Sequence, residues 1–319
     1  MTQPSPQLAP ARGAAVAEWR RRPERGSQLA LRIMAWLSIR LGRPAGRMLL
    51  YLIAGYYFVF APRARRNMRD YLRRALGREP RASDRFRLIM TFSTSIHDRI
   101  YLLAEHYPLF EVSLQGEPLM NEVVAAGGGA VLMGAHMGSF EIIGSIGRRQ
   151  PGLQVSMAMY EDNARKINSI LAAINPEAKP DIISLGHINA MLRIADRLDR
   201  GAFVGMLGDR TLGDEPVHEV MILGERAYLP TGPMRAAAIL RRSVFFMLGL
   251  YRGGNRYHVV FEPIADFSEV TPKTRDAAVR AAVERYAALL DRHCRNDPYN
   301  WFNFFDFWRP PTPTRKIKS

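Results

Sequence analysis

From about residue 105 onward, short apolar runs alternate with stretches of helical periodicity, and this alternation constrains the fold more than any other feature. Apolar runs of this length are typical of strands that are buried on both faces. They lie at residues 130–135, 155–159, 181–185, 202–207, 244–250 and 257–261. Candidate helices lie at residues 139–149, 164–174, 188–199, 231–242 and 272–296. Such alternation predicts an α/β fold with a mostly parallel sheet flanked by helices.

The first 81 residues hold most of the net charge. The whole chain carries +15, and residues 1–81 contain 17 arginines and no lysine against four acidic residues, a surplus of 13 positive charges. A charge of this sign requires an anionic partner, either nucleic acid or an anionic membrane surface. Nucleic acid is disfavoured, because the arginines are interleaved with an apolar run and no recognition motif is present.

The apolar run in this segment is residues 48–61, which carry no charge and lie between Arg47 and Arg63. A membrane-spanning helix needs about 20 apolar residues, and a shorter run is more typical of a buried, re-entrant or interfacial segment. Both flanks are rich in arginine, so the positive-inside rule gives no orientation. We expect the segment to lie on or dip into the cytoplasmic leaflet of an anionic membrane. The side chains expected at the headgroup level are aromatic or basic: Trp36, Arg47, Tyr51, Tyr56, Tyr57 and Arg63.

Changes in composition and the positions of Gly and Pro residues along the chain predict four parts. They are a mobile basic lead-in at residues 1–28, a helical, arginine-rich, membrane-associating segment at 29–104, the α/β domain at 105–310 and a tail at 311–319. Within residues 29–78 we expect helices that break near Gly42, Pro44 and Gly46 and again at Pro62. The alternative for this segment is a basic, solvated face over a buried core helix.

Residues that can carry chemistry gather after the first strand. Gly134-Ala-His136-Met-Gly-Ser-Phe-Glu141 leaves that strand and enters a helix, with Ser139 as a candidate N-cap. His136 then lies at the carboxyl edge of the sheet, where open α/β sheets place their ligands. A general-base histidine needs a carboxylate that fixes its tautomer, and Glu141 in the first helical turn is close enough for this role. The alternative is a hydrogen-bonded histidine at a strand end.

Other kinds of site are excluded by spacing. The chain has no Gly-x-Ser-x-Gly elbow, and its single cysteine, Cys294, lies in a late helix, so an activated hydroxyl would belong to the substrate. Residues 127–129 are glycines that precede a strand, whereas a dinucleotide fingerprint must follow one. No His or Cys cluster has the spacing of a metal site. We therefore expect neither a metal ion nor a bound cofactor.

Taken together, the motifs resemble the bacterial lipid A biosynthesis (late) acyltransferases, within the lysophospholipid acyltransferase superfamily. The resemblance covers about residues 19–310 and has four parts. They are His136-x4-Glu141, Leu207-Gly-Asp209-Arg210, the glycine loop and alanine-rich helix from Ile222 through Thr231-Gly232-Pro233, and the aromatic segment from Tyr299 to Pro310.

The resemblance implies a membrane-associated O-acyltransferase on the cytoplasmic face of the bacterial inner membrane. It would move a fatty acyl chain from acyl carrier protein or coenzyme A to a hydroxyl of a glycolipid such as a lipid A precursor. His136 would take the proton from the acceptor hydroxyl, and Glu141 would orient the imidazole. The residues expected to bind substrate, as oxyanion donors or phosphate ligands, are Asp209, Arg210, Gly224, Thr231 and Gly232.

Several alternatives accompany these roles. Asp209 could simply hold Arg210, and Thr231-Gly232-Pro233 is more typical of a helix entry than of a catalytic element. The aromatic segment, residues 299–308, could pack in the core, but its many rings favour an acyl groove or the membrane surface.

Two departures from the family pattern leave the acceptor open. The wider superfamily usually has His-x4-Asp, whereas this chain has the glutamate form of the lipid A branch. Its C-terminal segment reads Phe302-Asn-Phe-Phe-Asp-Phe-Trp308, where lipid A enzymes are commonly rich in His and Arg, so fewer cations can meet a phosphorylated sugar. An aryl polyene lipid headgroup and a lysophospholipid are alternative acceptors. A non-catalytic membrane scaffold is the alternative from another class, and it would not need His136 and Glu141.

Overall fold

The computed structural model of the 319-residue chain describes residues 28–149, 154–160, 181–185, 189–211 and 215–310. The expected lead-in lies outside these ranges except for its last residue. The expected helix at residues 164–174 and the expected tail at 311–319 lie outside them entirely.

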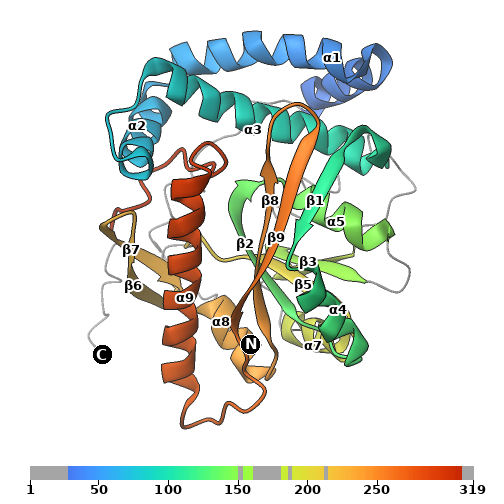
Figure 1. The fold of residues 1–319 in the computed structure, drawn as a ribbon, viewed down its shortest axis with the longest axis vertical. Helices are drawn as coiled ribbons and strands as arrows, with labels where there is room; N and C mark the ends of the chain where they lie inside the picture. The colour runs from blue at the N-terminus through green and yellow to red at the C-terminus, as the bar shows by residue number, and fades with distance from the viewer. Residues whose placement is uncertain (1–27, 150–153, 161–180, 186–188, 212–214, 311–319) are drawn as a thin grey trace, which may run out of the picture.

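A seven-stranded sheet forms the centre of the molecule (Figure 1), in the order β1-β9-β8-β2-β5-β3-β4. All neighbouring strands are parallel except β8 and β9. The strands of this sheet are β1 Glu111–Gln115, β2 Val131–Gly138, β3 Val155–Tyr160, β4 Ile182–Leu185, β5 Phe203–Leu207, β8 Val244–Tyr251 and β9 Arg256–Ala265. A separate antiparallel hairpin consists of β6 Val217–Ile222 and β7 Glu225–Pro230.

Helices cover both faces of the sheet, so the predicted mostly parallel α/β fold is confirmed. The helices are α1 Gln28–Phe60, α2 Pro62–Leu76, α3 Ala82–Leu103, α4 Glu117–Ala125, α5 Phe140–Arg149, α7 Ala190–Asp199, α8 Gly232–Ile239 and α9 Arg275–Asn296, with a single 3₁₀ turn at Tyr107–Leu109. Successive residues of β2 enter different core clusters. Val131 and Met133 pack with residues of α7, α8 and α9, and Leu132 packs with residues of α4, α5 and the end of α3. A strand buried on both faces has no polar alternation, which is why it reads as a continuous apolar run.

All six predicted strands are present, and the strands that sequence analysis missed are the polar ones. In β1, exposed residues alternate with half-buried ones. The β6–β7 hairpin occupies much of the stretch that was interpreted as a glycine loop. Its two turn residues, Leu223 and Gly224, both have positive φ (53° and 82°), which is the geometry of a tight two-residue hairpin turn.

The N-terminal helices break where the sequence predicts. Gly42 has non-helical angles (φ 80°, ψ 164°) inside α1, and α2 begins at Pro62. Within the described residues, no single helix has the length and hydropathy of a membrane span. Ser38–Phe60 and Pro62–Leu76 pass that test only as a pair, bent by 95°.

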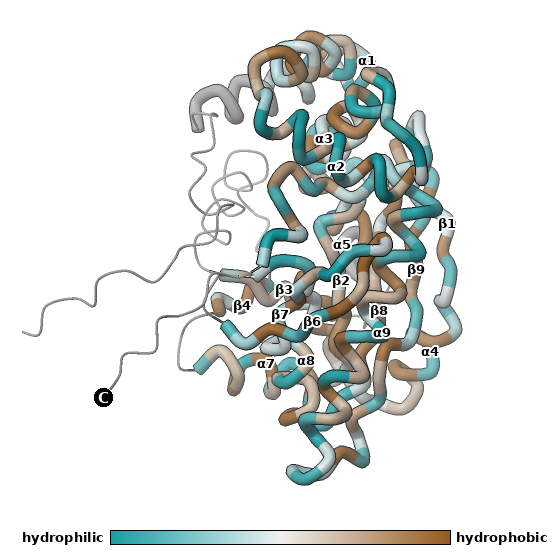
Figure 2. Tube along the Cα trace, turned by 90° about the vertical axis from the view of Figure 1, so that its left-hand side faces the viewer, coloured by the Kyte–Doolittle hydropathy of each residue, from teal (hydrophilic) through white to brown (hydrophobic). Residues whose placement is uncertain are grey.

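Helix α1 exposes many large apolar side chains over much of its surface. The helix packs against α3 at one end of the molecule (Figures 1 and 2). Its exposed large apolar residues are Trp36, Ile39, Leu41, Met48, Leu49, Tyr51, Leu52, Ile53, Tyr56, Tyr57, Val59 and Phe60. We call this set of residues the α1 apolar face. The alternative of a basic, solvated face over a core helix is wrong for these positions of α1.

The aromatic segment 299–308 packs largely in the core, which is one of the three positions considered for it, and its contact with an acyl chain stays a prediction. Trp301, Phe302 and Phe307 are buried. The backbone explains this position, because Trp301 bridges Met137 at the end of β2 and the N–H of Phe302 donates to the carbonyl of His136. The segment therefore extends the sheet edge that carries His136.

Candidate active site

Strand β2 carries His136 to the carboxyl edge of the sheet, between β5 and β8. The strand ends at Gly138, whose φ is +72°, and a Cβ at this position would lie 2.0 Å from the carbonyl oxygen of Gly249 in β8. Only glycine permits this combination of positive φ and close backbone approach. The N–H of Ser139 then donates to the same carbonyl at 2.8 Å. The chain thus turns directly from His136 into α5.

Asp209 is the carboxylate that holds His136. The Nδ1 atom of His136 lies 2.8 Å from Oδ1 of Asp209, and the backbone N–H of His136 donates to Oδ2 at 3.0 Å. The two residues are far apart in sequence, but His136 lies near the end of β2 and Asp209 follows β5, an adjacent parallel strand in which Leu207 is the register partner of Gly134 of β2. Parallel strands end at the same edge, so the fold itself creates the pair.

The carboxylate of Asp209 is buried and ionised. Its side chain is 2% exposed, and the indole N–H of Trp301 donates to Oδ2 at 3.0 Å. Burial raises the pKa of this carboxyl, but the neighbouring His136, Arg210 and Trp301 outweigh burial and hold the pKa well below its ordinary value. A charged carboxylate with these donors can fix one imidazole tautomer and stabilise an imidazolium.

The two ring nitrogens of His136 have different surroundings, because Nδ1 faces Asp209 and Nε2 does not. Its side chain is 31% exposed, and in the described part of the chain no hydrogen-bond partner lies on Nε2. Burial and then the charge of Arg210 lower the pKa of this histidine, against the raising effect of Asp209. The ring is therefore neutral at pH 7, with its proton on Nδ1 facing Asp209 and a lone pair on Nε2. This arrangement is that of a general base.

Glu141 does not orient His136 as the sequence led us to expect. Its Oε1 lies 2.6 Å from Nε of Arg99 on α3, and the hydroxyl of Ser139 donates to Oε2 at 3.2 Å. Ser139 directly precedes α5, as predicted, and Glu141 in the first turn meets α3, which packs against α5. Sequence analysis missed Arg99, because nothing local marks one arginine of an earlier helix as its partner. Its charge also lowers the pKa of His136.

Arg210 lies beside the same histidine. One of its N–H groups donates to the carbonyl of Phe302 at 3.2 Å, and its guanidinium lies over the ring of Phe305 at 5.2 Å. Burial lowers the pKa of Arg210, with Asp209 opposing. Asp209 also attracts Arg210 electrostatically, but its hydrogen bonds to His136 and Trp301 show that it does more than hold Arg210.

The three remaining predicted substrate-binding residues lie in the turn of the β6–β7 hairpin and directly after β7. Gly224 is in the hairpin turn, and the N–H of its neighbour Leu223 donates to Asp291 of α9. Thr231 directly precedes α8, which begins at Gly232, so the predicted helix entry is confirmed. Both the N–H and the hydroxyl of Thr231 donate to the carbonyl of Pro216, at 3.0 and 3.2 Å. Substrate contact by these residues stays a prediction.

The predicted membrane residues divide into two groups. Four aromatic residues belong to the α1 apolar face, and Arg63 is exposed. Arg47 is different, because its guanidinium donates to the carbonyl of Gly254 and to the hydroxyl of Tyr251 at the β8–β9 turn. This arginine therefore fastens α1 to the sheet, and its contact with lipid stays a prediction.

No cluster of three or more His, Cys, Asp or Glu side chains that could hold a metal ion occurs among the described residues. The chemistry available at this edge of the sheet is thus that of an imidazole, two carboxylates and two guanidinium groups.

Comparison with protein families gives a match along most of the chain. The model for the bacterial lipid A biosynthesis acyltransferase matches residues 20–310, a range that contains every residue of this site. Comparison with curated proteins returns no match.

Proposed function

The chain belongs to the bacterial lipid A biosynthesis acyltransferase family, and from this premise we propose that it transfers a fatty acyl chain from an acyl thioester to a hydroxyl of a glycolipid. Acyl carrier protein is the proposed donor, and coenzyme A thioester the alternative. The observation that carries the proposal is the His136–Asp209 pair, in which a buried carboxylate holds one nitrogen of a partly exposed imidazole.

The reaction needs one base and one acid, and His136 supplies both in turn. The Nε2 lone pair takes the proton of the acceptor hydroxyl while the hydroxyl oxygen attacks the thioester carbonyl carbon. The tetrahedral intermediate then collapses, the carbon–sulfur bond breaks, and the imidazolium returns the proton to the leaving thiolate. Asp209 stabilises the imidazolium between the two steps.

The tetrahedral intermediate carries a negative oxygen that must be stabilised. Arg210 is the proposed donor, because its guanidinium lies beside His136 in surroundings buried enough to lower its pKa. A charge there acts more strongly than in water. Glu141, paired with Arg99, is proposed as a positioning residue at the rim of this site. If the acceptor bears a phosphate, the planar fork of either arginine suits it.

The α1 apolar face supports a location on the cytoplasmic side of the inner membrane. Large aromatic and aliphatic side chains are exposed there next to arginines, as expected for an interfacial helix. A protein held in this way resists extraction by high salt and is released by detergent. Release by salt alone would contradict the assignment of this face to the bilayer.

The proposed activity is tested with membranes that contain the wild type, His136→Ala or His218→Ala. His218 is the matched control, because it also pairs with a carboxylate, Glu284 at 3.0 Å, but lies on the exposed hairpin. Acyl carrier protein loaded with a labelled acyl chain is the donor, and mass spectrometry resolves the lipid products. A parallel arm replaces the donor with acyl coenzyme A.

We expect a new acylated lipid from the wild type and from His218→Ala, and a loss of about 10²–10⁴ in rate for His136→Ala. The product mass identifies the acceptor, and an acylated lysophospholipid would replace the glycolipid in the proposal. Equal product from His136→Ala would refute the role of His136. Absence of product from all variants with both donors would favour the scaffold interpretation.

A further inference from the structure

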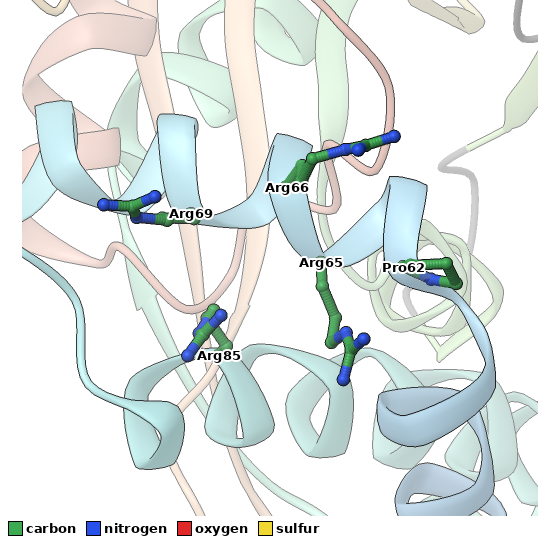
Figure 3. Close-up of a pocket in the computed structure, with 5 residues that line it drawn as sticks. All are labelled: Pro62, Arg65, Arg66, Arg69 and Arg85. Atoms are coloured by element: carbon green, nitrogen blue, oxygen red, sulfur yellow. The ribbon is translucent and has the colours of Figure 1, made fainter.

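A basic cavity of about 240 Å³ lies where α1 turns into α2 (Figure 3). Its lining consists of one proline and four arginines: Pro62, Arg65, Arg66, Arg69 and Arg85. Three of the arginines belong to α2 and the fourth to α3. We call this cavity the arginine pocket.

Two guanidinium groups converge in the arginine pocket. Arg65 reaches from α2 and Arg85 from α3, so that both lie in the space between the helices (Figure 3). Both also lie over the ring of Phe58, at 5.7 and 5.8 Å from its centroid. The Nε atom of Arg85 is buried without a hydrogen-bond partner. Like charges are thus held together around one aromatic ring.

The protein supplies little negative charge to this pocket. Arg69 pairs with Glu79, and both side chains of that pair are more than half exposed. Within the described ranges, no carboxylate forms an ion pair with Arg65, Arg66 or Arg85. The exposed carboxylate of Glu79, whose charge also acts on Arg85, offsets the repulsion among these arginines only in part, so an anion bound between them reduces that repulsion further.

The arginine pocket adjoins the α1 apolar face. Phe60 is the last residue of α1, only two positions before Pro62, and its side chain is 60% exposed. Tyr56 and Val59, on the same last turns of α1, are 56% and 55% exposed. A charged pocket next to an apolar surface matches a ligand with one anionic end and one apolar end.

We propose that the arginine pocket binds the phosphate group of a membrane phospholipid whose acyl chains lie along the α1 apolar face. Phosphate is favoured over other anions, because a guanidinium donates two parallel hydrogen bonds to its oxygens. The N-terminus of α2, which begins at Pro62, adds a partial positive charge on the same side. The site fixes how the protein lies on the membrane and takes no part in acyl transfer.

The test is vesicle flotation of the full chain. One set of vesicles contains a neutral, phosphate-free galactolipid with phosphatidylglycerol, and the other contains the same galactolipid with oleate at the same negative surface charge. The wild type should prefer the phosphatidylglycerol vesicles. The double variant Arg65→Lys/Arg85→Lys keeps every charge and the cation–π contacts with Phe58, but a lysine cannot donate the two parallel hydrogen bonds that a guanidinium gives to a phosphate. Its affinity for these vesicles should therefore fall about tenfold. Its binding to oleate vesicles should be unchanged.

Arg280→Lys is the matched control, since Arg280 is exposed on α9. It should behave as the wild type does in both arms, and thermal unfolding should confirm that all variants are folded. The proposal would be overturned if the double variant kept the preference for phosphatidylglycerol vesicles. It would also be overturned if Arg280→Lys lost this preference to the same extent as the double variant. Arg66→Lys provides a second, milder variant of the same pocket, should the double variant unfold.

Two other occupants give different results, and either would overturn the lipid assignment. A soluble phosphate compound would be indicated if inorganic phosphate, at matched ionic strength, raised the Tm of the wild type but not of the double variant while vesicle preference stayed the same. An acidic carrier protein would be indicated if only carrier-protein binding were lost. The readout is binding, and His136→Ala should retain it, so failure here leaves the proposed acyl transfer untouched.

Discussion

Two clusters in this protein contain the same three residue types, and they do different things. One lies at the edge of the sheet and consists of His136, Asp209 and Arg210. The other lies between α1 and α3 and consists of His97, Asp98 and Arg43. We call them the edge cluster and the clamp cluster.

The clamp cluster joins separate elements of the fold through Arg43, Asp98 and Nε2 of His97. Arg43 of α1 donates to both carboxylate oxygens of Asp98, each at 2.7 Å, and the hydroxyl of Tyr257 in β9 donates to the same group at 2.8 Å. Nε2 of His97 lies 3.1 Å from the hydroxyl oxygen of Ser38. Asp98 thus joins α1, α3 and the sheet.

Exposure and the second ring nitrogen distinguish the two clusters. The side chain of His97 is 1% exposed, against 31% for His136. Nε2 of His97 is engaged by Ser38, whereas within the described residues no hydrogen-bond partner is found for Nε2 of His136. The same residue types therefore form a clamp where both nitrogens are enclosed by protein, and a general base where one nitrogen can reach a substrate.

The strongest way to break this comparison is to neutralise each aspartate in turn. Asp209→Asn should lower kcat by about 10³–10⁴, because an amide neither fixes the Nδ1–H tautomer nor stabilises the imidazolium. The measurement is kcat for acyl transfer, with thermal unfolding to show that the variant is folded. Wild-type kcat in this variant would remove Asp209 from the mechanism.

Asp98→Asn should instead act on stability. Removing one partner of a buried ion pair leaves Arg43 uncompensated at only 12% exposure, and the free energy of unfolding should fall by about 3–5 kcal/mol. Urea denaturation measures this change, and kcat per folded molecule should stay near that of the wild type. A fall in kcat with unchanged stability would show that the clamp cluster also takes part in catalysis.

The Arg99–Glu141 pair sharpens the comparison, because α3 carries both Asp98 of the clamp cluster and Arg99 at the edge cluster. If Glu141 acts by position, Glu141→Gln and Arg99→Gln should each lower kcat by about 10–10² through small misplacement of the site. The double variant should lose no more than either single variant, since both break one contact. Additive losses in the double variant would mean that the two side chains act independently.

The smallest expected effect is the response to pH. Burial lowers the pKa of both histidines below 6.5. The general base must be neutral, so kcat/KM should fall as the pH decreases through the pKa of His136, at a pH below 6.5. Between 6.5 and the folded-state pKa of each histidine, the unfolded chain binds the extra proton, so stability should decrease as the pH falls.

His97→Gln separates these two effects. In this variant the decrease of kcat/KM at acid pH should occur at the same pH as in the wild type. The decrease in the free energy of unfolding below pH 6.5 should be smaller, because one of the two buried histidines no longer titrates. The measurements are a pH profile of kcat/KM and urea denaturation at several pH values. A shift in the pH at which kcat/KM decreases in His97→Gln would couple the two clusters.

Much of the fold was predictable, because it depends on local pattern. The buried strands β2, β3, β4, β5, β8 and β9 read as apolar runs, and the breaks at Gly42 and Pro62 follow from backbone conformation alone. Strand β1 and the β6–β7 hairpin were missed, since their exposed positions interrupt the apolar pattern. Core packing of the aromatic segment 299–308 was left open among three positions, because ring content does not reveal that Trp301 and Phe302 pair with the end of β2.

The sequence by itself determined that His136 lies where a strand leads into a helix, and hence that it lies at the carboxyl edge of the sheet. Only the tertiary structure decided which carboxylate holds it. Glu141 is the local candidate, but Asp209 is the neighbour, because β5 lies beside β2 in the sheet. Periodicity specifies each element from residues close in the chain, whereas strand order arises from packing between distant segments. The partners of a histidine at a sheet edge are set by that order.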